Sequence, residues 1–384
     1  MKVLMFSTDA KIFEEGTDAR ARMLEYGGLF EELHLVILSG RTFDVRRSKF
    51  EKIGNTFFYA TNSRWKISRL FDAYKIAKTI IIHYSLFTNH PVISTQDPFE
   101  TGIVGYMLKR KFRIPLQVQV HTDFFSPYFA AESWKNKLRV IVGRRIVRAA
   151  DSIRAVSERI KRTLVGEGDV APEKISVLPI FVDAAALRAA LPAFDLRKKY
   201  PQFGEIILMA SRLTKEKNIG LAIAAMQKVI KKYPHAGLVI VGEGPEKPKL
   251  ELYAKRYTLN ANIVFEPWTN DLASYYKGAD VFLMTSNYEG YGRTAVGAAV
   301  CGLPVVMTDV GLAGDFIADG FNGVVCPVGD ARAVTEALLR LLDKPSLRQE
   351  FGMHHGEVLS QLPSHAQYLA KYKELLEKTL YASA

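Results

Sequence analysis

The segment EIILMASRLTKEKNIGLAIAAMQKVIKKYPHAGLVIVGEGPEK, residues 205–247, contains one complete repeat of an alternating α/β fold. Two short apolar runs, 205–211 and 237–242, are typical of buried strands. The stretch between them has helical length, and four apolar residues recur on one stripe of it: Ile219, Ile223, Met226 and Ile230. This order of strand, helix and strand predicts two parallel strands joined by a right-handed crossover.

The same alternation continues along the chain. Apolar runs typical of buried strands are KVLMFS (2–7), LHLVILS (33–39), PVIST (91–95), LQVQV (116–120), SIRAVS (152–157), DVFLMTS (280–286) and LPVVMT (303–308). The pattern restarts near 205, after a Pro-, Gly- and charge-containing stretch at 189–204. We therefore predict an α/β protein with two doubly wound, Rossmann-like domains facing a cleft, at 1–186 and 187–365. The final helix, 366–384, should pack back on the first domain.

Composition narrows the class of protein. The chain has 384 residues, 48% of them hydrophobic and 24% charged, which suits two soluble globular domains. No apolar run approaches the ~20 residues that span a bilayer, and the first residues do not resemble a secretion signal. Two cysteines, Cys301 and Cys326, suit reduced thiols and provide no metal site. We expect a cytoplasmic protein, peripheral on the inner face of the membrane in one interpretation.

Three loops at the predicted strand ends carry candidate ligand-binding residues. Arg212 and Lys217 stand just before a helix start, where two cations suit a diphosphate, although an exposed basic turn is the simpler alternative. Gly242 and Gly244 would let a backbone approach a ligand, or make a tight turn. Trp268 would stack on a base, or belong to the core.

A fourth loop, SNYEGYGRTAVGAAVCGLPVV at 286–306, contains Glu289 ahead of a predicted helix near 294–301. Its carboxylate would accept hydrogen bonds from sugar hydroxyls and stabilise positive charge at an anomeric carbon. Backbone N–H groups of Gly290, Tyr291 and Gly292 would hold other hydroxyls. The alternative is an acidic residue favoured by the helix dipole.

In order and spacing, these loops together resemble the retaining glycosyltransferases of family 4, the group 1 glycosyltransferases with GT-B architecture. The strongest matches are SRLTKEKN, VGEGPEK, EGYG followed by CGLPVV, and DGFNGVVCPVGD. The resemblance continues in the first half through VQVHTDFFSPYF, ADSIRAVSERIKRTL and KISVLPIFVD. It implies a metal-independent enzyme that moves a sugar from a nucleoside-diphosphate sugar to a glycan or lipid-linked hydroxyl, with no bound cofactor.

The resemblance also implies roles at matching positions. Arg212 and Lys217 would bind the donor diphosphate, and Glu289 the transferred sugar. His121 matches a family histidine near the sugar and acceptor, although a satisfied turn histidine is the alternative. Gly16 matches the glycine of the first loop, which approaches the phosphates, within EEG rather than the usual glycine pair.

Three residues depart from the family pattern. Gly297 stands where a second family Glu grips the ribose hydroxyls, Pro267 falls near a usual glycine of the base loop, and Asp315 shortens another usual Glu. We interpret the chain as an enzyme with a weakened or rebuilt ribose pocket. Either the pocket merely lacks a carboxylate, or, as we favour, Gly297 makes room for a bulkier neighbour or an unusual donor. The competing hypotheses are a non-catalytic GT-B scaffold that binds membrane or a partner enzyme, and a sugar-nucleotide epimerase or phosphorylase.

The formal net charge of +12 indicates anionic partners. No zinc-finger or RNA-binding motif is present, so we expect no nucleic-acid partner. Residues 134–150 predict a helix, with Leu138, Val142, Ile146 and Ala149 on one side. A second side carries the candidate membrane or acceptor residues Trp134, Lys137, Ile141, Arg144 and Arg148. The segment SRWKISRLF (63–71) repeats this mixture of cations and aromatic residues, and a solvated basic face is the alternative.

Overall fold

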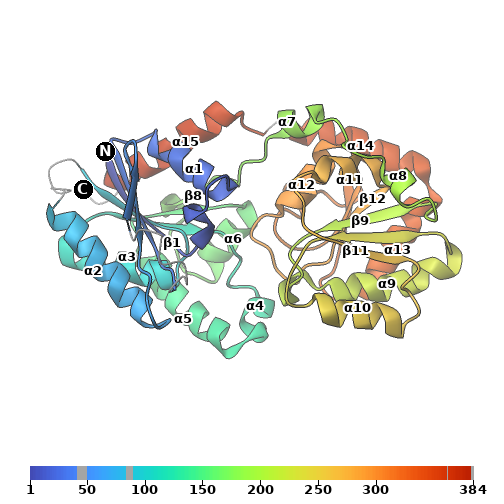
Figure 1. Ribbon diagram of the computed structural model, residues 1–384, viewed down its shortest axis with the longest axis horizontal. Helices are drawn as coiled ribbons and strands as arrows, with labels where there is room; N and C mark the ends of the chain where they lie inside the picture. The colour runs from blue at the N-terminus through green and yellow to red at the C-terminus, as the bar shows by residue number, and fades with distance from the viewer. Residues whose placement is uncertain (41–49, 84–89, 361, 382–384) are drawn as a thin grey trace. The chain divides into compact units, whose positions relative to one another are not determined.

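The computed structural model describes residues 1–40, 50–83, 90–360 and 362–381 (Figure 1). Two compact units make up the chain. The first contains residues 1–125, 133–179 and 365–384, and the second contains 126–132 and 180–364. Each has its own sheet and its own core, so each is described by itself.

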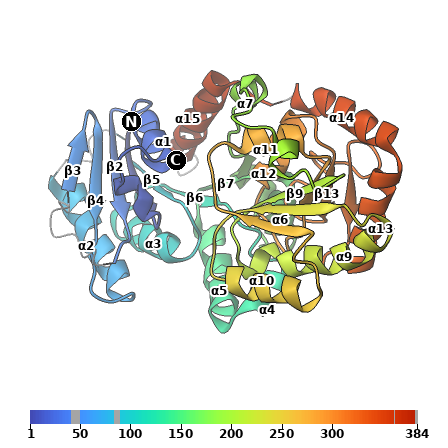
Figure 2. The ribbon, with the colours of Figure 1, turned by 45° about the vertical axis from the view of Figure 1, so that its right-hand side comes forward.

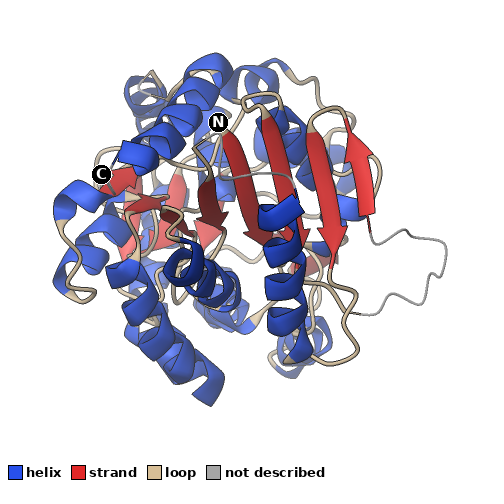
Figure 3. Ribbon diagram, turned by 90° about the vertical axis from the view of Figure 1, so that its left-hand side faces the viewer, coloured by secondary structure: helices blue, strands red, loops and turns tan. Residues whose placement is uncertain are grey.

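The first unit is built on an eight-stranded sheet with the order β3-β4-β2-β1-β5-β6-β7-β8 (Figure 3). All neighbouring strands are parallel except β3 and β4, which pair antiparallel at one edge. The central strand β1 is buried along its whole length, as strands covered on both faces must be. The strands are β1 (Lys2–Ser7), β2 (Glu32–Ile37), β3 (Phe50–Ile53), β4 (Thr56–Ala60), β5 (Val92–Thr95), β6 (Leu116–Val120), β7 (Ser152–Ala155) and β8 (Ile175–Val177).

The helices of this unit cover both faces of the sheet. Helices α2, α3 and α5 pack side by side, whereas α1 and α15 meet elsewhere through stacked Tyr26 and Tyr372 rings, 4.1 Å apart. Buried Arg154 also fixes α15, because its guanidinium donates to the Tyr368 hydroxyl at 2.8 Å. The C-terminal helix therefore packs on the first unit. The helices are η1 (Ala10–Phe13), α1 (Asp18–Gly27), α2 (Ser68–His83), α3 (Glu100–Phe112), α5 (Trp134–Ala149), α6 (Glu158–Gly166), η3 (Pro172–Lys174) and α15 (His365–Tyr381).

The second unit has a six-stranded, fully parallel sheet with the order β11-β10-β9-β12-β13-β14. It includes the strand-helix-strand segment at 205–247, in which β9 and β10 pair directly. From β9 the chain steps to β10 and β11 on one side, and β12 leads to β13 and β14 on the other. The strands are β9 (Ile206–Ala210), β10 (Gly237–Val241), β11 (Ile263–Glu266), β12 (Val281–Met284), β13 (Val305–Thr308) and β14 (Gly323–Cys326).

The helices of the second unit are distributed over both faces of its sheet (Figure 2). The apolar stripe of α9 is buried against α13 and the sheet, and Ile223, Met226 and Val229 are fully covered there. Helices α11 and α12 contact the sheet through β9, β12 and β13. The helices are α4 (Pro127–Glu132), α7 (Ala184–Ala189), α8 (Leu196–Lys199), η4 (Lys215–Lys217), α9 (Ile219–Lys232), α10 (Lys247–Arg256), α11 (Leu272–Gly278), α12 (Arg293–Val300), α13 (Ala331–Asp343) and α14 (Pro345–Leu359).

Three features differ from the sequence-based expectations. The units divide at 179/180 rather than 186/187, and α4 belongs to the second unit although it lies within the first predicted domain. The α4 residue Phe129 is buried and packs edge-on against Tyr288, which explains why α4 belongs there. The third difference concerns the strands, because five of them were not predicted: β3, β4, β8, β11 and β14. The exposed edge position of antiparallel β3 gives it little of the apolar pattern that identifies a buried strand.

In the part of the chain that the structure describes, no helix is long and apolar enough to cross a bilayer. Both cysteines are free thiols; Cys326 is buried, whereas Cys301 is only half-buried. Burial raises the pKa of the Cys301 thiol to about 11 and that of Cys326 to about 12. Both therefore stay protonated at neutral pH.

Candidate active site

The strand order of the second unit places the candidate loops together. β9 and β12 are neighbours, and the chain leaves them toward opposite edges of the sheet. Ligands of open α/β sheets bind at such a reversal point, beyond the carboxyl ends of the strands. The loop after β9 carries Arg212 and Lys217, and the loop after β12 carries Glu289.

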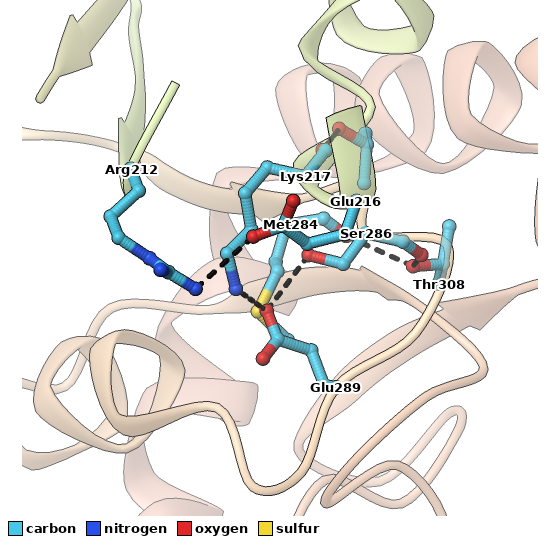
Figure 4. A network of polar contacts seen from close by, with 8 residues as sticks. Arg212, Glu216, Lys217, Met284, Ser286, Glu289 and Thr308 are labelled. Atoms are coloured by element: carbon cyan, nitrogen blue, oxygen red, sulfur yellow. Dashed lines mark hydrogen bonds and ion pairs between the residues drawn. The ribbon is translucent and has the colours of Figure 1, made fainter. Parts of the chain in front are cut away.

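An ion pair joins these two loops (Figure 4). The Lys217 ammonium (Nζ) lies 2.5 Å from Oε1 of Glu289, and both side chains are largely shielded, with 14% and 13% of their surfaces exposed. The Ser286 hydroxyl donates to the same Oε1 at 2.9 Å. Among the described residues, Oε2 of Glu289 accepts no hydrogen bond, so half of the carboxylate is available to a ligand.

Further hydrogen bonds hold the two loops in register. The Asn287 N–H donates to the Glu216 carbonyl at 2.7 Å, and the Thr285 hydroxyl donates to the Asn218 carbonyl at 3.0 Å. On the other side, the Thr308 hydroxyl donates to the Ser286 carbonyl at 2.6 Å. The geometry of Lys217 and Glu289 is therefore fixed by the backbone and does not depend on the ion pair alone.

Arg212 is positioned differently from Lys217. Its guanidinium forms an ion pair with Glu216 at 3.1 Å, yet 74% of its side chain is exposed. An exposed pair of this kind contributes little to stability, so Arg212 can exchange Glu216 for a ligand at small cost. Helix α9 begins directly after this loop, at Ile219, and its first N–H groups favour an anion.

The glycine next to Glu289 on the neighbouring loop was not identified from the sequence. A Cβ on Gly311 would lie 2.4 Å from the Tyr291 carbonyl oxygen and 2.9 Å from Cβ of Glu289. The φ angle of Gly311 is also +57°. Only glycine therefore lets the loop after β13 press against the Glu289 loop. The signal in the sequence was the glycine pair in VGLAG, which lacks a distinctive spacing.

Gly242 and Gly244 have a structural explanation of their own. A Cβ at Gly242 would lie 1.8 Å from the Ser211 carbonyl oxygen, and one at Gly244 would lie 2.3 Å from that of Leu213. These glycines allow the loop after β10 to pack against the backbone of the Arg212 loop. Contact with a ligand is not needed to account for them.

Trp268 and Tyr291 differ in exposure. The Trp268 side chain is 48% exposed in the loop after β11, which excludes the alternative that it belongs to the core. Tyr291 is buried, with its pKa raised to about 12 by that burial, and its neighbours Gly290 and Gly292 are buried too. Gly292 has φ +110° and begins α12.

The space beside Gly297 is occupied by another side chain. A Cβ on Gly297 would lie 3.0 Å from both the hydroxyl oxygen and Cε2 of Tyr276. Tyr276 is 2% exposed and belongs to α11, and burial raises the pKa of its hydroxyl, which therefore stays protonated. The bulkier neighbour expected beside Gly297 is thus present, although the sequence did not identify it.

The first unit supplies the other two candidates. His121 lies at the end of β6 and contacts Oε1 of Gln119 through Nε2 at 3.2 Å. Burial, with Arg154 and Arg22 nearby, lowers the pKa of His121 to about 3, so its imidazole is neutral at physiological pH. Gly16 is exposed in the loop before α1, with φ +76° and open space where a Cβ would stand.

Helix α5 of the first unit exposes a mixed apolar and basic surface. Leu138 was expected among the packed residues, but it is 53% exposed and lies on the same face as Trp134 and Ile141, which are 71% and 69% exposed. The packed face instead contains Asn136, Gly143, Ile146 and Val147. Lys137, Arg145 and Arg148 are exposed on the same side as the apolar residues, whereas Arg144 is half-buried with its guanidinium over the Phe125 ring.

Comparison with known proteins identifies the family. The family model described as Glycosyl transferases group 1 matches residues 195–354, and the one described as Glycosyltransferase Family 4 matches residues 33–186. The chain belongs to the group 1 glycosyltransferases. The fold is GT-B, and the protein is an enzyme rather than the non-catalytic scaffold considered as an alternative.

The chain is similar to several glycosyltransferases along much of its length. It is 26% identical over 355 residues to alpha-monoglucosyldiacylglycerol synthase of Streptococcus pneumoniae, covering 82% of this chain and 79% of that protein. It is 25% identical over 249 residues to the Acholeplasma laidlawii protein of that name, covering 61% of this chain and 62% of the relative.

Solved structures share the fold. Sucrose-phosphate synthase of Thermosynechococcus elongatus superposes with a TM-score of 0.81 at 20% identity, covering 100% of both chains. The Anabaena protein HepE in complex with UDP-glucose gives a TM-score of 0.75 at 17% identity and covers 99% of both chains.

Proposed function

We propose that this glycosyltransferase moves a sugar from a nucleoside-diphosphate sugar to a hydroxyl group with retention of anomeric configuration. The observation that carries the proposal is the ion pair between Lys217 and Glu289 at the reversal point of the sheet. It places a cation suited to a diphosphate directly beside a carboxylate suited to a sugar. The related HepE protein was solved with UDP-glucose, which supports a donor of this class.

The residues divide the chemistry between them. Lys217, Arg212 and the first turn of α9 would stabilise negative charge on the departing diphosphate, so this chemistry does not call for a metal ion. Glu289 would orient the sugar through Oε2 and stabilise the positive charge at the anomeric carbon as the bond breaks. Because Oε1 is already held by Lys217 and Ser286, the carboxylate is oriented before the donor arrives.

In this proposal His121 contacts the sugar or acceptor as a neutral imidazole. Its lowered pKa means that it would act as a hydrogen-bond partner and not as a cation at neutral pH. Gly16 leaves room for a phosphate at the exposed start of α1.

We further propose that the acceptor is a glycan or a lipid-linked sugar, reached from the cytoplasmic face of a membrane. Trp134, Leu138 and Ile141 expose a row of large apolar side chains along α5, where Lys137 and Arg145 add positive charge. Such a surface suits a bilayer containing anionic lipid, since apolar groups enter the interface while cations meet the headgroups. Two relatives are called alpha-monoglucosyldiacylglycerol synthase, a name that refers to a lipid, and this agrees with a lipid-linked acceptor.

The donor is tested by a thermal-shift and hydrolysis screen against UDP-, GDP- and ADP-sugars. We expect one class to raise the melting temperature and to be slowly hydrolysed, with the anomeric configuration of the released sugar retained by NMR. Glu289→Gln serves as the control with strongly reduced turnover. Failure of every nucleotide sugar to bind or react, or a product of inverted configuration, would contradict the proposed reaction.

The membrane surface is tested by sedimentation with vesicles of phosphatidylglycerol and phosphatidylcholine. We expect binding to anionic vesicles that weakens with salt, and loss of binding when Trp134, Leu138 and Ile141 are changed to serine. The matched control replaces Met353 and Leu252, which are similarly exposed on the second unit. Equal binding by both variants would show that α5 is not the contact surface.

A further inference from the structure

A chain of buried hydrogen bonds reaches His121 from the interior of the first unit. Gln119 lies near the end of β6, two residues before His121, and its side chain is 2% exposed. Its Oε1 atom lies 3.2 Å from Nε2 of His121 and 3.0 Å from Nη1 of Arg154, which is buried as well. One amide oxygen therefore contacts both of these side chains.

Arg154 determines which atom of the Gln119 amide faces His121. A guanidinium group only donates hydrogen bonds, so the amide atom beside it is the oxygen. The amide nitrogen donates in the other direction, to Oγ of Ser94 at 3.0 Å and to the hydroxyl oxygen of Tyr372 at 3.1 Å. Both hydrogens of the amide nitrogen and both lone pairs of the amide oxygen are thereby used, and this fixes the orientation of the amide.

The orientation of the amide in turn fixes the tautomer of His121. The imidazole is neutral and carries one hydrogen, and the nitrogen that faces an acceptor oxygen is the one that carries it. The hydrogen is therefore on Nε2, and Nδ1 has a lone pair. Nδ1 forms no hydrogen bond with any residue that the structure describes. Because the His121 side chain is only half-buried, Nδ1 is left for a ligand group that donates a hydrogen bond.

The C-terminal helix α15 holds the guanidinium of Arg154 in place. Nη2 of Arg154 donates to the Tyr368 hydroxyl at 2.8 Å and to the Pro179 carbonyl at 3.3 Å. Nε donates to the Leu178 carbonyl at 3.3 Å. Tyr368 belongs to α15, as does Tyr372, which accepts from the amide. One helix thus anchors both groups that lie behind the imidazole.

We infer that Arg154 and Gln119 are positioning residues that hold His121 in the Nε2–H tautomer and present Nδ1 to a hydroxyl group of the substrate. A hydroxyl can donate to this lone pair. An ionised diphosphate cannot, because its oxygens only accept hydrogen bonds. His121 is therefore assigned to a hydroxyl of the transferred sugar or of the acceptor, and not to the diphosphate. The inference rests on the proposed transfer reaction and specifies the atom through which His121 takes part.

NMR of protein labelled with nitrogen-15 in its histidine rings shows the tautomer directly, without a ligand. At pH 8 we expect one tautomer for His121 in the wild-type chain, with a hydrogen on Nε2 that exchanges slowly with water. Gln119→Met removes the acceptor with little change in side-chain length, and the slowly exchanging signal should disappear. Gln119→Glu keeps an oxygen at this position and should preserve the signal.

The same NMR experiment identifies the source of the hydroxyl. UDP, GDP or ADP alone should leave the Nδ1 resonance of His121 unchanged, and a shift of that resonance would contradict the hydroxyl assignment. A shift with UDP-glucose, GDP-mannose or ADP-glucose would identify a hydroxyl of the transferred sugar. A shift only after octyl glucoside is added to the nucleoside-diphosphate complex would identify the acceptor. No shift in either of these two experiments would refute the assignment of Nδ1 to a hydroxyl.

Turnover measures the consequence for transfer. With the nucleotide sugar that the thermal-shift screen selects, Gln119→Met should lower kcat about three- to tenfold, as expected for one misplaced neutral hydrogen bond. The affinity for the nucleoside diphosphate should not change, and Gln119→Glu should retain most of the turnover. Gln117→Met is the matched control, because Gln117 is also buried on β6 and donates to the Leu375 carbonyl of α15. We expect this control to lower the melting temperature while the His121 signal and kcat stay as in wild type.

The outcomes separate this inference from the proposed function. A hydrogen on Nδ1 of His121 in the free wild-type chain would overturn the inference, even if the Gln119 variants failed to fold. Full turnover by Gln119→Met, or an equal loss of turnover in Gln119→Met and Gln119→Glu, would refute the positioning role. If no nucleotide sugar bound, the proposed function and the substrate assignment would both be wrong, whereas the tautomer would still be measured in the free chain.

Discussion

Replacing Glu289 by glutamine isolates its charge from its shape. The amide keeps an oxygen at the position of Oε1, so it can still accept from the Ser286 hydroxyl and from the Lys217 ammonium. Two unit charges 4 Å apart interact by about 4 kcal/mol at the effective dielectric of a protein surface site. Because Lys217 lies 2.5 Å from the carboxylate and cancels part of its field, we expect a loss of about 2–3 kcal/mol in the transition state.

This loss corresponds to a fall in kcat of roughly 30- to 200-fold. Binding of a nucleoside diphosphate should stay unchanged or become slightly tighter, since Lys217 no longer faces an anion. The assay is steady-state transfer or donor hydrolysis, with calorimetry on the same preparation. Glu336→Gln is the control, because that carboxylate forms an exposed ion pair with Arg332 on α13. Glu289→Asp retains the negative charge on a shorter side chain. It should lose less activity than Glu289→Gln if the charge, rather than the length of the side chain, determines the rate.

Wild-type turnover in Glu289→Gln would refute the assignment of this carboxylate to the sugar. Loss of activity with a matching loss of nucleotide affinity would instead show that the variant disturbs the diphosphate site. Loss of activity with a melting temperature several degrees lower would show that the substitution destabilises the folded protein.

Three further outcomes follow from the same structure. Arg212→Ala should weaken nucleoside-diphosphate binding about tenfold with no change in melting temperature. Lys217→Ala should weaken that binding and also destabilise the fold, because it leaves the shielded Glu289 without its cation. Unchanged nucleotide affinity in both variants would exclude a role for these residues in phosphate binding. Gly311→Ala should lower the melting temperature and abolish transfer, since its Cβ would overlap the Tyr291 carbonyl; a fully active, equally stable variant would refute this packing argument. The His121 imidazole should remain neutral from pH 8 to pH 5 in an NMR titration, and a pKa above 6 would contradict the burial that lowers it.

The sign of the histidine effect on stability also follows. The folded pKa of His121 is about 3, below the ordinary value of 6.5, so the unfolded chain binds its proton first as the pH falls. Its contribution to stability is therefore complete above pH 6.5 and is lost progressively toward pH 3. His121→Gln should flatten the decline in melting temperature between those values.

The local pattern of the sequence was sufficient for the fold class and for the choice of candidate site residues. Strand and helix alternation depends on short-range periodicity, which the segment at 205–247 contains in full. Parallel α/β topology then requires the loops after β9 and β12 to lie at the carboxyl ends of strands. Arg212, Lys217 and Glu289 could therefore be selected from residue type and position alone.

The pairing of those loops was decided by tertiary structure. Lys217 and Glu289 are 72 residues apart in the chain, and they meet only because β9 and β12 are neighbours in the sheet. Strand order depends on how whole helices pack on the sheet, so the hydrophobic periodicity of the sequence does not predict it. The same applies to α4, a segment of the first half that packs on Tyr288 of the second unit.

The remaining differences concern the direction in which single side chains point. The helix at 134–150 was predicted, yet Leu138 faces solvent because the packed stripe of α5 runs through Gly143 and Ile146. The glycine at 297 was identified as a departure, but its neighbour Tyr276 comes from a different helix and bears no sequence relation to it. Sequence thus determined the fold class and indicated the candidate reactive residues of this protein. Only the packed structure decided which of them touch, because contact depends on Cβ directions and distances of a few ångströms that residue order does not specify.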